Sequence, residues 1–537
     1  MQVEGLRTTD INNTNELVWF KEQYRQLEIE NQKLKSNIIE FKNKYLEMKE
    51  QRDLLLWKRF GRSAEQLVDE SQQLLFNEKA EITETVETKE NKSSANDEIS
   101  EVKSYTRKKS GRKAIDPNIE RRINLIDIPE DEKTCACGAK LSRIGEETSE
   151  KFHIIPQQIY VEKIVRPKYA CRCCEGTETE DICPTVRIAP VPPAIIPKSI
   201  TSPGLLSTIF TQKFEMHLPY YRQEKLFEMI GASISRQDMS NWQQKVFEFL
   251  KILFLLLFKT LKSGPVMQMD ETTVQVIGEE DRKDTQKSYM WLARGGPPDK
   301  KVIWYEYHPT RAAYNAKKFL EGYSGFLQTD GYKGYDTAVE GNSDIIHVGC
   351  FAHARRKFFE AAKVNANSIS ANEGIKYIRL LYEIENKLRD DFEKSNDIEK
   401  FLVDRKVQAK PVLDKFKAWL DKRALDIPPS TLLGSAISYS LAQWNKMIAY
   451  LESPYLTPDN NACENAIRPF VLGRKNWLFC QSVGGVESSC GIYTLIETAK
   501  QNGLVPFNYL KTLFEKAPLA VSKKDWEKLL PWNIFTA

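Results

Sequence analysis

Apolar side chains recur at alternating steps of three and four residues near the start of the chain, with Glu and Lys filling the positions between. The series is Leu17, Phe20, Tyr24, Leu27, Asn31, Leu34, Ile38, Phe41, Tyr45, Met48, Arg52 and Leu55. This a/d heptad pattern predicts a coiled coil over residues 13–60 that joins protomers into a homodimer or a higher oligomer. Asn31 falls on an a position, where a polar residue fixes register and strand number. The alternative is one amphipathic helix that packs on its own chain.

The pattern is lost in residues 77–115, where Glu, Lys, Thr and Ser dominate. Because this composition buries no core, it predicts a flexible charged linker. A proline-rich connector over residues 184–203 follows later in the chain, and it leads into a helical region over residues 200–262.

This region contains a helix over Tyr220–Ile230, a turn at Gly231, and a second helix that Ser235 caps. The pattern is typical of a helix-turn-helix reader of DNA, in which the polar start of the second helix, at Arg236 and Gln237, contacts the duplex. Plain helical packing is the alternative.

From residue 263 the period changes to that of strands. We expect strands at 266–277, 288–293, 302–307, 326–330 and 345–348, with helices over 311–320 and around His353. The order β-β-β-α-β-α is that of a ribonuclease H-like fold, here over residues 263–500. A helical insertion over 360–455 interrupts it, and a helical tail over 501–537 completes a multidomain α/β chain.

The formal charge of +4 over 537 residues does not by itself indicate nucleic-acid binding, but basic residues cluster at 107–113, 355–357 and 474–475. Such clusters favour local phosphate contacts, although a solvated face explains many of them. The polar N-terminus lacks a signal-peptide core, and the longest apolar run, Ile252–Phe258, is far shorter than the ~20 residues of a membrane span. We therefore expect a soluble cytoplasmic protein without a membrane partner.

Half of the ten cysteines lie close together, at Cys135, Cys137, Cys171, Cys173 and Cys174. Without a secretion signal, this grouping favours metal over disulfides. We expect Cys135, Cys137, Cys171 and Cys174 to hold one structural Zn²⁺ in a module over residues 116–183. Unbound buried cysteines are the alternative.

Three carboxylates are the candidates for chemistry. Asp270 lies in the first strand of the 263–500 region, Asp330 at the end of the fourth, and Glu464 in a segment that continues to Arg468, Arg474 and Lys475. On a helix Glu464 shares a face with Arg468 and Lys475, although Pro469 would kink that helix. Brought together, three carboxylates repel each other unless divalent cations bind, and Mg²⁺ or Mn²⁺ suits oxygen ligands. The alternatives are two aspartates that cap turns and a surface Glu–Arg pair.

At this point the chain resembles the bacterial insertion-sequence DDE transposases of the sixty-six group, in their large zinc-finger-bearing subunit. The resemblance covers nearly the whole chain. Its carriers are Phe60-Gly-Arg-Ser, Arg166-Pro-Lys-Tyr-Ala-Cys171, Leu218-Pro-Tyr-Tyr-Arg-Gln-Glu-Lys225, Met269-Asp-Glu-Thr272, Thr329-Asp-Gly-Tyr332, Cys350-Phe-Ala-His-Ala-Arg-Arg-Lys-Phe358, Glu464-Asn-Ala-Ile-Arg-Pro469, Gly473-Arg-Lys-Asn-Trp-Leu478 and Leu495-Ile-Glu-Thr-Ala-Lys500.

The resemblance implies a D-D-E triad at Asp270, Asp330 and Glu464, with two Mg²⁺ or Mn²⁺ ions per active site. It implies cleavage of double-stranded DNA at element ends and transfer of the 3′-hydroxyls into target DNA, with helper proteins as possible partners. The Cys135-Ala-Cys137 spacing departs from many relatives, which makes Cys135 the least secure zinc ligand.

Expected DNA contacts are Arg355, Arg356, Lys357, Arg468, Arg474, Lys475, Arg236 and Gln237. His353 is as well explained by packing or a phosphate contact as by catalysis. Two other functions remain open: a ribonuclease H-like nuclease that does not join DNA, and an inactive, dimeric, zinc-bearing regulator that binds DNA.

Overall fold

The computed structural model describes residues 7–60, 159–170, 186–364 and 369–534. The chain divides into two units, one of residues 1–68 with 159–537 and one of residues 69–158. The predicted linker and the four predicted zinc ligands lie outside the described residues. None of the described helices is both long and apolar enough to cross a membrane.

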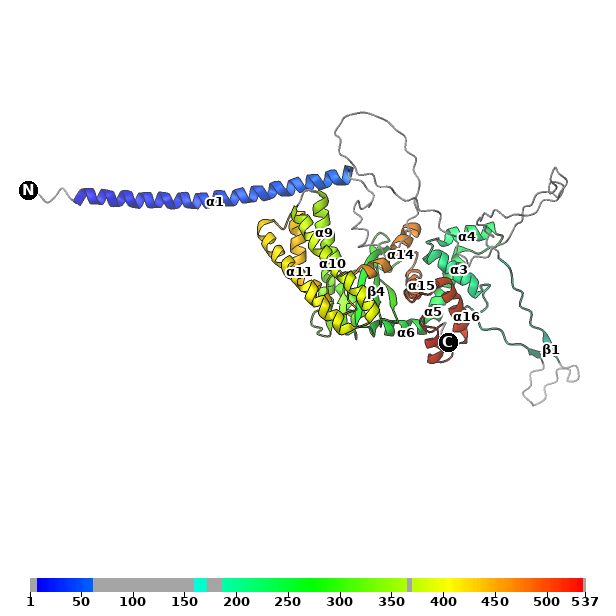
Figure 1. Ribbon diagram of the computed structural model, residues 1–537. Coiled ribbons are helices and arrows are strands. Elements are labelled where there is room, and N and C mark those ends of the chain that lie inside the picture. Colours follow the sequence, from blue (N-terminus) through cyan, green and yellow to red (C-terminus); the bar gives the residue numbers. More distant parts are fainter. Residues whose placement is uncertain (1–6, 61–158, 171–185, 365–368, 535–537) are drawn as a thin grey trace, which may run out of the picture. The chain divides into compact units, whose positions relative to one another are not determined.

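The N-terminal heptad pattern forms one uninterrupted helix, α1 (Arg7–Phe60), of 54 residues (Figure 1). Its apolar stripe from Phe20 onward is exposed, from 55% at Leu34 to 72% at Phe41. The predicted helix is therefore confirmed. Its pairing with a second copy stays a prediction.

Two short strands, β1 (Lys168–Ala170) and β2 (Val186–Ile188), pair antiparallel, with Tyr169 opposite Arg187. Arg166 donates a hydrogen bond to the carbonyl of Ala189 at 2.7 Å, which extends this ribbon by side-chain contact. The predicted proline-rich connector thus begins with a strand.

A five-stranded sheet carries the remaining strands. They are β3 (Val266–Gln275), β4 (Lys287–Gly295), β5 (Val302–His308), β6 (Gly325–Gln328) and β7 (Ile345–Val348). The order across the sheet is β5-β4-β3-β6-β7; β3, β4 and β5 form an antiparallel meander, and β6 and β7 run parallel to β3. All five predicted strands are present, with ends that shift by up to two residues.

Helix α7 (Ala313–Leu320) connects the meander to β6, and α8 (Lys333–Val339) connects β6 to β7. Because β3 and β6 are parallel neighbours and Gln328, the last residue of β6, pairs with Gln268, the chain leaves β6 beside the middle of β3. The expected helix over 311–320 is confirmed, although it begins two residues later, since Arg311 is used in a contact with β3.

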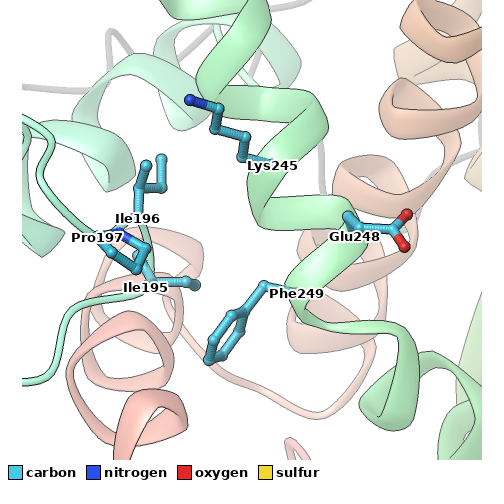
Figure 2. Close-up of a pocket in the computed structure, with 6 residues that line it drawn as sticks. All are labelled: Ile195, Ile196, Pro197, Lys245, Glu248 and Phe249. Carbon is cyan, nitrogen blue, oxygen red and sulfur yellow. The ribbon is translucent and has the colours of Figure 1, made fainter.

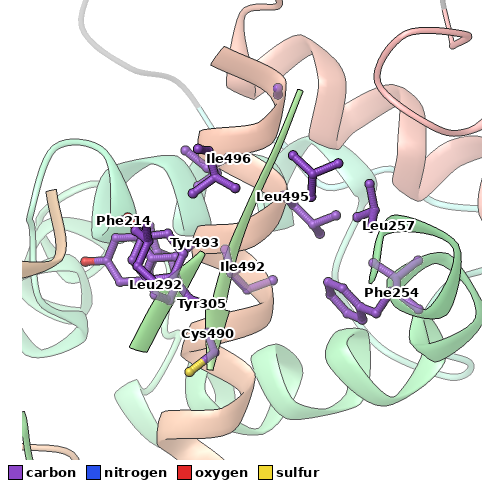
Figure 3. Close-up of a cluster of buried hydrophobic side chains, with 14 of the residues drawn as sticks. Phe214, Phe254, Leu257, Leu292, Tyr305, Cys490, Ile492, Tyr493, Leu495 and Ile496 are labelled. Atoms are coloured by element: carbon purple, nitrogen blue, oxygen red, sulfur yellow. The ribbon is translucent and has the colours of Figure 1, made fainter. Parts of the chain in front are cut away.

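Helix α15 (Val483–Gln501) covers the sheet at its β5 edge. The hydroxyls of Thr494 and Thr498 accept hydrogen bonds from the amides of Tyr305 and Ile303, at 3.0 and 3.1 Å. These contacts occupy backbone groups that an edge strand would otherwise expose. Figure 3 shows Tyr493, Leu495 and Ile496 of this helix among the buried side chains that join it to the sheet and to the helices before it.

The region before the sheet is helical, as predicted. It contains α3 (Pro203–Phe214), α4 (Tyr220–Met229), α5 (Arg236–Phe249) and α6 (Lys251–Lys262). Gly231, with a φ of 83°, follows α4, and the Ser235 hydroxyl caps α5 by accepting a hydrogen bond from the Asp238 amide. The end of the proline-rich connector packs on α5, where Ile195 to Pro197, Lys245, Glu248 and Phe249 line a pocket of about 280 Å³ (Figure 2).

The predicted insertion is confirmed as helical. It begins near the end of α9 (Phe351–Val364), the helix expected around His353, and contains α10 (Ile369–Ser395), α11 (Ile398–Asp426), α12 (Leu432–Ala442), α13 (Trp444–Ile448) and the 3-10 turn η2 (Ala449–Glu452). Arg405 is fully buried in it and donates to Glu385 and to the carbonyls of Tyr450, Ser453 and Leu456. The insertion therefore holds the segment that leads back toward Glu464.

Helix α14 (Asn461–Trp477) carries Glu464 in its first turn and remains one helix despite Pro469. The carbonyl that Pro469 leaves without its usual donor belongs to Asn465, which is exposed, so water can satisfy it. The chain ends with α16 (Pro506–Lys516), the 3-10 turn η3 (Ala517–Leu519) and α17 (Lys523–Lys528).

Candidate active site

The sheet brings Asp270 and Asp330 close to each other, where β6 ends beside β3. Gln268 of β3 is the register partner of Gln328 of β6, and each aspartate follows its glutamine by two residues. Strand β6 ends at Gln328, so Asp330 lies just beyond it, where its Oδ1 accepts a hydrogen bond from the Tyr332 amide at 2.9 Å. Asp330 therefore caps a turn, as one interpretation of the sequence expected, and also lies beside Asp270.

Asn460 connects the third carboxylate to these strands. Its side-chain amide donates to the carbonyl of Met269, one residue before Asp270, at 3.0 Å, and its backbone amide donates to the sulfur of Cys350 at 3.3 Å. The Asn460 carbonyl accepts hydrogen bonds from the amides that open α14, including that of Glu464 at 3.1 Å. The start of α14 is thus fixed against β3, and Glu464 lies close to Asp270.

The charges of the other two carboxylates act on Asp270. Burial raises the pKa of Asp270 to about 7, with further increases from the charges of Glu271, Glu464 and Asp330. The Glu271 amide donates to Asp270 Oδ1 at 2.9 Å and acts in the opposite direction. A bound cation would stabilise the ionised form of Asp270 and lower its pKa.

Polar and basic groups from α9 surround Glu464. Its carboxylate lies 3.7 Å from His353 Nε2 and 3.3 Å from Arg356 Nη2. Burial lowers the pKa of His353, while the charge of Glu464 opposes that shift. Cys350, His353 and Glu464 place one possible ligand atom each within 4.8 Å of one another, so this group could also hold a metal ion.

Glu271 is a site residue that the sequence reasoning did not single out. Its side chain is 2% exposed and contacts the guanidinium of Arg311 and the hydroxyl of Tyr335. Arg311 in turn stacks over the ring of Tyr332 at 3.6 Å, and Tyr332 follows Asp330 by two residues. Asp270 and Glu271 are adjacent in a strand, so their side chains face opposite sides of the sheet. The sequence therefore indicated that Glu271 has surroundings of its own.

The expected DNA contacts of α9 and α14 differ in exposure. Arg355 is 8% exposed, so it is poorly placed for a phosphate, whereas Arg356 is exposed and Lys357 is half-buried, near the Tyr439 ring. On α14, Arg468 and Lys475 are exposed, and Arg474 is half-buried against β3.

Arg474 is engaged inside the protein. Its Nη1 donates to the carbonyl and the hydroxyl of Thr273 and to the Thr272 hydroxyl. Arg236 and Gln237, by contrast, are exposed at the start of α5. These two residues, with Arg356, Arg468 and Lys475, are the accessible members of the predicted set.

Comparison with known proteins extends this description to the whole chain. Residues 198–488 match the family described as "Transposase IS66 family", 132–175 match the "zinc-finger binding domain of transposase IS66", and 494–532 match the "IS66 C-terminal element". Residues 47–123 match a family described as "Transposase C of IS166 homeodomain".

Two curated relatives come from Sinorhizobium fredii. The chain is 31% identical to "Uncharacterized protein y4jD" over 77% of its own length and 80% of the relative's. It is 30% identical to "Uncharacterized protein y4hP" over 81% and 79% of the two lengths. The chain therefore belongs to the IS66 family of transposases, nucleic-acid-processing enzymes whose partner is DNA.

Proposed function

We propose that the protein is a DDE transposase that cleaves the ends of an insertion element and joins their 3′-hydroxyls to target DNA. Asp270, Asp330 and Glu464 are its three catalytic carboxylates. The observation that carries the proposal is that β3, the turn after β6 and the start of α14 meet, which buries Asp270 where the charges of Glu464 and Asp330 raise its pKa. The charges that raise the pKa of Asp270 are those of other carboxylates, as expected where a divalent cation is to be bound.

The residues fit a divalent cation by their chemistry. Carboxylate oxygens from β3, from the turn after β6 and from α14 form the hard donor set that Mg²⁺ and Mn²⁺ prefer. Two such ions, when bound, supply activation of the attacking oxygen and stabilisation of the leaving oxygen in phosphoryl transfer. The protein's own part is to hold the three carboxylates close to one another, where β6 ends beside β3 and Asn460 fixes Glu464 against β3.

The ribonuclease H-like fold is part of this proposal. Its support is the order β5-β4-β3-β6-β7, with an antiparallel meander followed by two parallel strands. Asp270 then lies in the central strand and Asp330 directly after its parallel neighbour. The helical insertion separates Glu464 from them in sequence and returns it to them in space.

DNA binding is assigned to the exposed basic and polar residues and to the half-buried Lys357. Arg356, Lys357, Arg468 and Lys475 flank the carboxylates on α9 and α14 and would hold phosphates, while Arg236 and Gln237 start the second helix of the helix-turn-helix-like pair. A structural Zn²⁺ at Cys135, Cys137, Cys171 and Cys174 is supported by the zinc-finger family match.

Pairing of two element ends is assigned to a dimer through α1. The exposed apolar stripe of this helix, with Asn31 on an a position, supports a coiled coil. Deletion of residues 1–60 should convert the protein to a monomer in light scattering and abolish paired-end complexes in gel shift. A truncated protein that stays dimeric and pairs ends would contradict this assignment.

Strand joining tests the central proposal. A labelled duplex that ends as the encoding element ends, with a free 3′-hydroxyl, is incubated with plasmid and Mg²⁺. Wild type should give joined product, and Asp330→Ala should give none. Cleavage without joining would favour the hydrolytic nuclease, and equal product from Asp330→Ala would rule out the assigned site.

A further inference from the structure

A continuous hydrogen-bonded series of side chains crosses the sheet two residues before Asp270 and Asp330. Arg294 Nη1 of β4 donates to Gln268 Oε1 at 3.0 Å, and Gln268 Nε2 of β3 donates to Gln328 Oε1 of β6 at 2.8 Å. Gln328 Nε2 then donates to the carbonyl of Thr457 at 2.7 Å. Gln268 is 3% exposed and Gln328 is 0% exposed, so water does not compete for these bonds.

The two ends of this series fix its direction. An arginine can only donate at one end, and a backbone carbonyl can only accept at the other. Each glutamine must therefore present its oxygen toward β4 and its nitrogen toward Thr457. A second contact, from Gln328 Nε2 to the carbonyl of Gly349 at 3.4 Å, agrees with the same orientation. Because buried amides are costly when unsatisfied, this arrangement favours one relative position of the strands and the Thr457 segment.

The series connects the segments that carry all three carboxylates. Side chains two residues apart in a strand share a face, so Gln268 lies in the layer below Asp270. Gln328, the register partner of Gln268, is the last residue of β6 and starts the turn that carries Asp330. Thr457 lies in the segment that leads to Glu464, directly after Leu456, whose carbonyl Arg405 holds from the insertion side.

We propose that Gln268 and Gln328 are positioning residues that set the spacing of Asp270, Asp330 and Glu464 and thereby the affinity of the site for divalent cations. This inference rests on the proposed function of the three carboxylates. Neither glutamine is assigned to substrate or to metal. Their action runs through the strands and through the Thr457 carbonyl, in the way that outer contacts tune the affinity of a metal site.

The experiment compares full-length wild type with Gln328→Met, which keeps a similar length and volume but removes both polar atoms. Binding of Mn²⁺ is followed by electron paramagnetic resonance, and the part that Asp330→Asn removes is taken as active-site binding. We expect Gln328→Met to weaken this component by about 10-fold or more. Strand joining should recover when Mn²⁺ is raised by the same factor.

Gln223→Met is the matched control. Gln223 is also 0% exposed, and its amide donates to the carbonyls of Ile209 and Leu218, away from the sheet. It should reduce the free energy of unfolding as Gln328→Met does, with unchanged Mn²⁺ affinity. If Gln328→Met fails to fold, Gln268→Met gives the same measurement and retains the bond to Thr457, with a smaller expected weakening.

The outcomes separate the two proposals. Mn²⁺ affinity at the wild-type value in a folded Gln328→Met protein would overturn the positioning role, even if stability falls. Equal Mn²⁺ binding by wild type and Asp330→Asn would instead overturn the assignment of the carboxylate site itself.

Discussion

Asp270 and Glu271 are neighbours in β3, yet their surroundings differ. Burial raises the pKa of Glu271, but its contacts with Arg311 and Tyr335 oppose that rise by stabilising its charge. Asp270 faces Glu464 and Asp330, whose charges raise its pKa. Burial of a carboxylate is therefore not a sign of function by itself. The presence or absence of compensating groups separates a residue that stabilises the fold from one that a ligand must neutralise.

The largest expected difference between Asp270 and Glu271 is in strand-joining activity. Asp270→Asn should reduce strand joining by on the order of 10³-fold, because it removes a charge that the phosphoryl-transfer site requires. Its melting temperature without metal should equal or exceed that of wild type, since a repulsive charge is lost. A variant that joins DNA at the wild-type rate would show that Asp270 is not a metal ligand.

Substitution of Glu271, in contrast, should reduce stability. Glu271→Gln should lower the free energy of unfolding by about 1 kcal/mol, less than the cost of breaking a fully buried ion pair, because Arg311 is itself 37% exposed and burial already disfavours the charge of Glu271. Urea denaturation measures the change, with Glu360→Gln on the exposed face of α9 as the control. A loss below that of the control would show that Glu271 is not stabilised by its partners.

The pH dependence of stability sharpens the difference. Because the folded-state pKa of Asp270 is about 7 and its ordinary value is 3.8, the folded protein binds a proton between pH 4 and 7 that the unfolded chain does not. Proton binding by Asp270 therefore stabilises the folded protein at low pH, and this stabilisation is lost as pH rises through 7. The free energy of unfolding falls by at most about 1.4 kcal/mol per pH unit.

Asp270→Asn should remove this contribution, so the difference between wild-type and variant unfolding curves over pH 4–7 isolates it from other buried acids. Saturating Mn²⁺ should remove it too, because the bound cation favours the ionised carboxylate. A difference that does not change with pH would place the raised pKa elsewhere.

Much of this arrangement could be predicted from the sequence. The alternation of apolar residues in β3 and the heptads of α1 are local patterns, and they gave the elements to within a few residues. The contacts that complete the site are not local. Asn460 reaches Met269, and Gln328 reaches Thr457, across long separations in the chain. No periodicity indicates which amide meets which carbonyl.

The same limit explains the basic residues. Arg355 and Arg356 are adjacent in one cluster, and composition cannot say which of them the helix buries. The first is 8% exposed, and the second lies 3.3 Å from Glu464. Exposure depends on which face of α9 packs on the insertion, and that is settled by tertiary contacts.

Arg468 and Arg474 extend the comparison to cations on one helix. Arg474 donates hydrogen bonds to Thr272 and Thr273 of β3, whereas Arg468 is exposed. Arg468→Ala should weaken binding to all DNA sequences and reduce the slope of log affinity against log salt by about 0.9, the share of one phosphate contact. Fluorescence anisotropy over a salt series measures both.

Arg474→Ala is the matched variant, and it should lower the free energy of unfolding more than it changes the salt slope. The reason is that its guanidinium joins α14 to β3, so its removal leaves backbone and hydroxyl acceptors of a half-buried site without their donor. If Arg474→Ala instead gives the full salt effect at unchanged stability, its contacts with β3 must open when DNA binds. Internal hydrogen bonds in the free protein would then not distinguish a structural arginine from one that binds DNA. The contrast between Asp270 and Glu271 would still hold.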